Sequence, residues 1–295
     1  GIGQPLHFLH ANGYPPECYQ PLLELLQNQY RVFGMLLRPL WPDSNPKDIR
    51  DWRPFSEDLL RFLAPPQPFD AAQDMPAPVI GVGHSIGAVV TLRAALRDPG
   101  KFKALVLIDP VLFVPRFLIM WHFIRMLGLG NKFHPLIPGA KKRRRTFDDL
   151  ETVFRGYRSR PVFRYMSNEN LRIYVEGMTR KTDQGYELAY SPEWEAHIYL
   201  TGLRDFELWR GLPKLRVPTL FLRGAETDTF LGNAARLVKR KLPAARVETL
   251  SRSTHILPLE RPQEVFDRMQ AFLNETLKVF TKHPRETNGA ETFRV

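Results

Sequence analysis

The chain has 295 residues, of which 43% are hydrophobic and 12% aromatic, a composition that can bury a large core. Its one cysteine, Cys18, excludes an intramolecular disulfide and a cysteine-based metal cluster, so the sequence predicts no metal site. The 42 Lys and Arg against 31 Asp and Glu give a formal net charge of +11, which favours anionic partners in general. Because zinc-finger spacing, an RNA-binding aromatic signature and a Walker-type loop are all missing from the sequence, we expect no nucleic-acid partner.

The N-terminal residues GIGQPLHFLH show none of the marks of a secretory signal. They lack a basic start, a longer apolar stretch and a small-residue cleavage site. No apolar run of the sequence reaches the roughly 18 residues that a membrane-spanning helix needs. We therefore expect a soluble, cytoplasmic protein.

An alternation of strand and helix patterns begins near the N-terminus. The apolar run 6–9 leads into the segment HANGYPP at 10–16, which is typical of a strand that ends in a tight loop. Leucines between positions 22 and 26 form a helical stripe, and residues 30–37 predict a second strand. A helical pattern at 55–63 follows, so the chain starts with a β-α-β-α rhythm.

Two continuous apolar runs, 78–83 and 104–108, have the character of strands buried on both faces. The segment 88–97 between them has the composition of a helix that stops at Asp98-Pro99-Gly100. Strand, helix and strand in this order imply a right-handed crossover and a parallel sheet. The rhythm returns near the C-terminus, with strands predicted at 217–222 and 246–250 and helices at 233–242 and 263–280.

The rhythm breaks between residues 111 and 202, which are rich in aromatic residues and arginine. We predict a mainly helical cap at 111–202, inserted into a core made of 1–110 and 203–295. Within it, residues 117–127 are apolar nearly all round, which indicates a packed helix or a lid that lines a pocket. The basic run 141–145 is predicted to be a solvated surface, and beside an apolar helix it would let the protein contact anionic lipid.

A G-x-S-x-G motif at 83–87 lies directly after a buried strand and directly before a helix. In that context the sharp turn presents Ser85 as a nucleophile and requires small residues two positions before and after it, which Gly83 and Gly87 provide. The helix that starts there directs backbone N–H groups at developing negative charge. The N–H of Ile86 is therefore the first candidate oxyanion donor.

A serine hydroxyl needs a histidine base that is itself oriented by a carboxylate. Of the eight histidines, His255 lies in the loop between the last predicted strand and the last helix, where such a base belongs. Asp109 and Asp228 both follow buried strands at the carboxyl edge of the sheet. We favour Asp228 as the acid, with Asp109 as the alternative and Glu226 as a third choice, because the chain order Ser, Asp, His holds for each of them.

The loop after the first strand is expected to supply the second oxyanion donor. We assign the backbone N–H of Asn12, with Ala11 and Gly13 as neighbouring alternatives. His10 and His84 lie close to these turns. We predict that both brace loops through hydrogen bonds rather than transfer protons.

The segments HANGYPP, GHSIG, LVLIDP, LFLRGAETD and STHILPLERP together resemble the ordered landmarks of the α/β-hydrolase fold family. The resemblance implies a mostly parallel central sheet flanked by helices, with a mainly helical cap. It also implies a cofactor-free mechanism in which His255 deprotonates Ser85 and an acyl-enzyme forms. A serine at position 85 argues against epoxide hydrolases and haloalkane dehalogenases, so carboxylesterases and lipases are the better match.

From the motifs and the resemblance we expect a serine hydrolase that cleaves small-molecule carboxylic esters of an apolar acyl group. Two alternatives remain. One is a carbon–carbon bond hydrolase of the meta-cleavage-product type, which uses the same three residues, and the other is a non-catalytic homologue that binds a ligand. The sequence does not define the acyl chain length, the alcohol or the oligomeric state.

Overall fold

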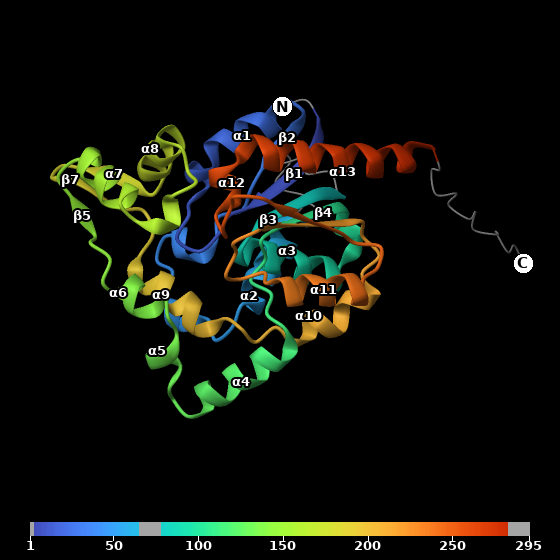
Figure 1. Ribbon diagram of the computed structural model, residues 1–295, viewed down its shortest axis with the longest axis horizontal. Coiled ribbons are helices and arrows are strands. Elements are labelled where there is room, and N and C mark those ends of the chain that lie inside the picture. Colours follow the sequence, from blue (N-terminus) through green and yellow to red (C-terminus); the bar gives the residue numbers. More distant parts are fainter. Residues whose placement is uncertain (1–2, 65–77, 283–295) are drawn as a thin grey trace, which may run out of the picture.

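The computed structural model describes residues 3–64 and 78–282, which form a central sheet, flanking helices and a large insertion (Figure 1). The sheet has the strand order β2-β1-β3-β4-β8-β9, and all of these neighbours pair in parallel. Its strands are β1 (Gln4–Leu9), β2 (Tyr30–Phe33), β3 (Val79–His84), β4 (Phe102–Ile108), β8 (Thr219–Gly224) and β9 (Arg246–Leu250). The predicted parallel α/β architecture is confirmed.

Helices cover both faces of the sheet (Figure 1). One face carries α1 (Gln20–Gln27), α12 (Leu257–Glu260) and α13 (Pro262–Lys282), and the other carries α2 (Arg53–Phe62), α3 (Ile86–Arg97), α10 (Phe206–Gly211) and α11 (Gly232–Lys241). Successive side chains of β4 alternate between the two cores: Leu105 and Leu107 pack on the α3 face, and Val106 and Ile108 pack on the α13 face. Because both faces are buried, the central strands read as continuous apolar runs in the sequence.

The insertion follows β4 and ends where the chain returns to α10 beside α3. It contains α4 (Pro115–Met126), α5 (Gly130–Phe133), α6 (Ile137–Lys141), α7 (Leu150–Arg158), α8 (Asn168–Gly177) and α9 (Pro192–Thr201). It also contains a small antiparallel sheet of β5 (Thr146–Phe147), β7 (Gly185–Leu188) and β6 (Thr179–Thr182), which we did not predict. These strands are only two to four residues long, too short to leave a hydrophobic periodicity in the sequence.

The predicted strand at 30–37 is shorter in the structure, since β2 ends at Phe33. Residues beyond it belong to a loop in which the N–H of Leu37 donates a hydrogen bond to Nε2 of His10, 3.0 Å away. Among the helices of residues 3–64 and 78–282, none has the length and apolar character that crossing a bilayer requires.

Candidate active site

Ser85 joins the end of β3 to the start of α3 in a strained turn. Its φ is +58° and its ψ is −119°, in a region that residues other than glycine seldom occupy. A Cβ at Gly83 would lie 2.5 Å from the backbone of Gly87, and a Cβ at Gly87 would lie 2.3 Å from the carbonyl oxygen of Leu9. The two glycines therefore let the turn close against the C-terminal end of β1.

His255 lies in the loop between β9 and α12, and its Nε2 is 2.9 Å from Oγ of Ser85. Ser85 is 6% exposed and the side chain of His255 is 21% exposed, so the pair is largely sheltered and still open to solvent on the histidine side. The loop is held by the buried carboxylate of Glu260, which accepts hydrogen bonds from the N–H and the hydroxyl of Thr254 at 2.7 and 2.8 Å. The arrangement allows the histidine to accept the proton of the serine hydroxyl.

Asp109, which directly follows β4, is the carboxylate that contacts the histidine. Nδ1 of His255 lies 3.1 Å from its Oδ1. The carboxylate is completely buried and accepts three further hydrogen bonds, from the N–H of Gly224 at 2.8 Å and from the hydroxyls of Thr227 and Thr229 at 2.6 Å each. With this many donors the carboxylate is fixed in place beside the imidazole.

Thr229 also contacts the histidine directly, with Oγ1 2.8 Å from Nδ1. Since the threonine hydroxyl gives its proton to Asp109, its oxygen is free to accept the Nδ1–H of His255. That proton is then shared between the threonine and the aspartate, which fixes the tautomer with Nε2 facing Ser85. No motif in the sequence pointed to Thr227 or Thr229.

The preference for Asp228 over Asp109 is corrected by this geometry. The side chains of Thr227 and Thr229 both turn inward to Asp109, and Asp228 between them is exposed. Within the described part of the chain, no hydrogen bond joins Asp228 to His255. Glu226 is exposed as well, and it pairs with Arg164 and with the hydroxyl of Tyr165 instead.

The electrostatic surroundings of His255 lead to a prediction for the pH dependence of activity. Burial lowers the pKa of His255, but the hydrogen bond and the charge of Asp109, with smaller contributions from Asp228 and Glu260, raise it above its ordinary value overall. An imidazole accepts a proton only when it is neutral, so, if His255 is the base, activity should fall as the pH drops through this raised pKa. Asp228→Asn removes one of the raising charges, and the acid limb of kcat/KM, measured between about pH 5 and 9, should move to lower pH. A limb that stays in place or moves to higher pH would contradict this assignment.

The loop after β1 lies against the first turn of α3, since a Cβ at Gly87 would lie 2.7 Å from the carbonyl oxygen of His10. The N–H of Ala11 already donates to the hydroxyl of Tyr19 at 3.2 Å, and the side chain of Asn12 donates to the carbonyl oxygen of Glu195 at 3.2 Å. Among the hydrogen bonds of the described residues, none uses the backbone N–H of Asn12. The N–H of Ile86 stands at the first position of α3, where a helix offers it no partner of its own.

His84 and His10 hold loops together, as predicted. Nε2–H of His84 donates to the carbonyl oxygen of His255 at 2.8 Å, so its Nδ1 accepts from the hydroxyl of Tyr19 at 2.7 Å. His10 bonds to its neighbour Ala11 through Nδ1 and accepts from the loop after β2 through Nε2. Burial lowers the pKa of His10 to about 4 and that of His84 well below its ordinary value, so both stay neutral braces.

Arg143 departs from the predicted solvated basic run. It forms an ion pair with Glu195 of α9 and donates to the hydroxyl of Tyr157 at 2.9 Å, and its side chain is only 14% exposed. The carboxylate of Glu195 packs against Gly13, next to Asn12. The insertion therefore contacts the loop that carries the candidate oxyanion donor.

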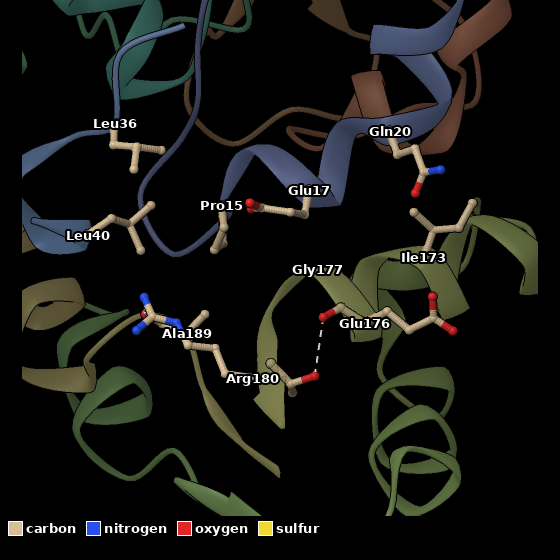
Figure 2. Close-up of a pocket in the computed structure, with 11 residues that line it drawn as sticks. Pro15, Glu17, Gln20, Leu36, Leu40, Ile173, Glu176, Gly177, Arg180 and Ala189 are labelled. Carbon is tan, nitrogen blue, oxygen red and sulfur yellow. Dashed lines mark hydrogen bonds between the residues drawn. The ribbon is translucent and has the colours of Figure 1, made fainter. Parts of the chain in front are cut away.

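A separate cavity of about 380 Å³ lies between the core and the insertion (Figure 2). Pro15, Leu36 and Leu40 line it from the core side, and Ile173 and Arg180 line it from α8 and β6. Ser85, His255 and Asp109 are not part of its lining.

Comparison with known proteins places the chain among hydrolases. A model described as "Alpha/beta hydrolase family" matches residues 8–268. The chain is 20% identical, over 94% of its length and 92% of the relative's, to an (E)-2-((N-methylformamido)methylene)succinate hydrolase of Acinetobacter baylyi. It is 20% identical to a pimeloyl-[acyl-carrier protein] methyl ester esterase of Legionella pneumophila, over 92% and 96% of the two chains. The crystal structure of an E-2-(acetamidomethylene)succinate hydrolase superimposes with a TM-score of 0.70 at 20% identity, over 93% and 92% of the two chains.

Proposed function

Since the chain belongs to the alpha/beta hydrolase family, we propose that it is a serine hydrolase that cleaves carboxylic esters of an apolar acyl group through an acyl-enzyme. The observation that carries the proposal is the unbroken series of hydrogen bonds from Asp109 through His255 to Ser85. Three further hydrogen bonds, donated to Asp109 by Gly224, Thr227 and Thr229, hold its carboxylate at Nδ1 of His255, so that Nε2 faces Ser85. Such a series is the arrangement that activates a serine hydroxyl.

In the proposed mechanism, Nε2 of His255 takes the proton of Ser85 as Oγ attacks the carbonyl carbon of the ester. Asp109 stabilises the imidazolium that forms, and the N–H groups of Asn12 and Ile86 bind the oxyanion. The imidazolium then returns its proton to the leaving alcohol, and the acyl group remains on Ser85. A water molecule, deprotonated by His255, attacks this acyl-enzyme and releases the acid.

Aromatic packing beside the site supports an apolar acyl group. The rings of Tyr157 and Phe163, from the insertion, pack with Tyr174 at centroid distances of 5.6 and 5.2 Å. Tyr174 lies 5.4 Å from Tyr14, whose ring is 6.4 Å from His84, the neighbour of Ser85. This series of ring contacts runs from the insertion to His84, whose ring is 5.1 Å from that of His255. The Legionella relative is itself named as a methyl ester esterase, which is consistent with ester chemistry.

Hydrolysis of p-nitrophenyl esters of increasing acyl length tests the proposal. We expect turnover of esters with apolar acyl chains and a loss of at least about 10⁴-fold in Ser85→Ala, because the nucleophile is removed. Ser56→Ala, at a serine buried in α2 away from the site, serves as the matched control and should retain activity.

The outcome also separates the alternatives. Equal turnover by Ser85→Ala and the unchanged protein would contradict the proposal. Cleavage of a vinylogous diketone with no cleavage of esters, established by product analysis, would favour carbon–carbon hydrolysis. Absence of any turnover by correctly folded protein would favour a ligand-binding homologue.

A further inference from the structure

An exposed apolar surface is concentrated on one part of the insertion. Seven of the twelve exposed large hydrophobic side chains of the described residues lie between positions 119 and 136. They are Ile119, Met120, Phe123, Met126, Leu127, Phe133 and Leu136, and their exposure runs from 46 to 73%. Figure 1 shows that α4 and α5 lie at the edge of the molecule, away from the central sheet. A concentration of this kind on a single soluble chain is unusual and indicates a contact surface.

The surface follows one face of α4. At 3.6 residues per turn, positions 119, 120, 123, 126 and 127 fall within an arc of about 120°. The opposite arc carries Leu118 and Trp121, which are buried at 2 and 4% exposure against the core. Helix α4 is therefore apolar on both sides, with one side packed and the other facing solvent. This explains why its sequence appears apolar nearly all round.

The same segment is uniformly basic. Residues 110–147 contain eight Lys and Arg side chains and no Asp or Glu. Arg143, Arg144 and Arg145 form ion pairs with Glu195, Asp148 and Glu193. The exposed side chains of Arg116, Lys132, Lys141 and Lys142 form no ion pair among the described residues. Of the basic run identified in the sequence, only Lys141 and Lys142 thus remain available, and Arg116 and Lys132 join them.

A groove at the base of α4 adds further positive charge. It encloses about 630 Å³ between the first turn of α4 and helix α11. Arg116 lines it together with Arg236, Arg240 and Lys241, and within the described part of the chain none of the four is in an ion pair. Arg116 falls within the exposed arc of α4, so the groove and the apolar face adjoin.

We propose that α4, α5 and α6 form a docking surface for a membrane that carries anionic lipid headgroups. Exposed Met, Leu and Phe side chains on a helix flanked by unpaired Lys and Arg have the chemistry of an element that lies in the bilayer interface. The cations bind headgroup phosphates and carboxylates while the apolar side chains enter the acyl boundary. An acidic protein partner would match the charge but would not account for five apolar side chains in one helical arc. The inference does not depend on the chemistry proposed for Ser85.

Vesicle co-sedimentation tests this docking surface. The unchanged protein should bind vesicles of phosphatidylcholine with about 30% phosphatidylserine at least about tenfold more tightly than pure phosphatidylcholine at low salt, and binding should weaken at about 0.5 M salt. Phe123→Ser combined with Met126→Ser and Leu127→Ser removes apolar side chains that are already exposed. Lys132→Glu combined with Lys141→Glu and Lys142→Glu reverses three of the unpaired charges. Each triple variant should lose at least about tenfold in vesicle affinity.

Matched controls make the same changes elsewhere on the surface. Leu36→Ser, Val162→Ser and Leu231→Ser alter exposed apolar positions outside the docking surface. Arg31→Glu, Arg155→Glu and Lys181→Glu give the same change in net charge on β2, α7 and β6. Both controls should bind anionic vesicles within about twofold of the unchanged protein.

Three results would overturn the proposal. The first is the absence of vesicle binding by the unchanged protein. The second is an equal loss in the docking-surface variants and their matched controls. The third is self-association without vesicle binding, abolished by the apolar triple variant and measured by sedimentation equilibrium, which would assign the surface to a second copy of the chain.

Discussion

We expect Asp109→Asn to lower kcat for ester hydrolysis by about 10⁴-fold while leaving KM nearly unchanged. The carboxylate fixes the tautomer of His255 through Nδ1 and stabilises the imidazolium, and both effects act on the transition state more than on bound substrate. An amide at this position can offer its NH₂ to Nδ1 and reverse the tautomer. Steady-state kinetics on a p-nitrophenyl ester measures the loss, and urea unfolding checks that the variant is folded.

Asp228→Asn is the matched control for this experiment, because it makes the same chemical change on an exposed side chain of the loop that follows β8. Its kcat at the pH optimum should stay within about threefold of the unchanged enzyme, as expected for an exposed charge. Full activity in Asp109→Asn with loss in Asp228→Asn would contradict the assignment of the acid.

A second large effect is expected at Gly87. A Cβ there would lie 2.3 Å from the carbonyl oxygen of Leu9 and 2.7 Å from that of His10, both of which are backbone atoms that cannot turn aside. Gly87→Ala must push β1 and the loop that carries Asn12 away from the turn at Ser85. We expect a loss of about 3 kcal/mol in the free energy of unfolding, with esterase activity reduced by at least about 100-fold.

Gly156→Ala is the control for Gly87→Ala, since both glycines lie in helices and a Cβ at Gly156 would have no neighbour within 4 Å. This variant should gain roughly 0.5–1 kcal/mol, because alanine restricts the unfolded chain and favours the helix. Urea unfolding curves of the two variants measure both effects. Equal stability of the two would show that the turn can relax around a methyl group.

The fold and the turn at Ser85 could be predicted because local sequence determines them. Continuous apolar runs identify the strands that are buried on both faces, and the two glycines around Ser85 meet a steric requirement that is set within five residues. His255 could be located because few histidines lie beyond the last strand. In each case the constraint acts between residues close in the sequence or fixed by the order of strands.

The choice between Asp109 and Asp228 could not be made from sequence, since both follow strands of the same sheet edge. It depends on which way the loop after β8 turns, and that is decided when Thr227 and Thr229 bond to a carboxylate more than 100 positions earlier in the chain. The sequence shows no sign of that contact. Because the side chains of Thr227 and Thr229 face inward, the side chain of Asp228 between them faces solvent.

The surroundings of the basic run at 141–145 could not be predicted from the sequence for the same reason. Five consecutive cations read as one solvated surface, but Arg143 turns inward because Glu195 of α9 meets it from a distant part of the insertion. Arg145 pairs with Glu193 two positions earlier in α9. Partners so far along the chain cannot be read from local charge patterns.

Covalent labelling by a fluorophosphonate, located by peptide mass spectrometry, tests the central claim most directly. The hydrogen bond to His255 should make the hydroxyl of Ser85 the reactive one, so a single adduct should form on the peptide that contains Ser85. No adduct should form in Ser85→Ala, and Asp109→Asn should label far more slowly than Asp228→Asn. An adduct on another residue, or equal labelling of folded Ser85→Ala, would contradict the account.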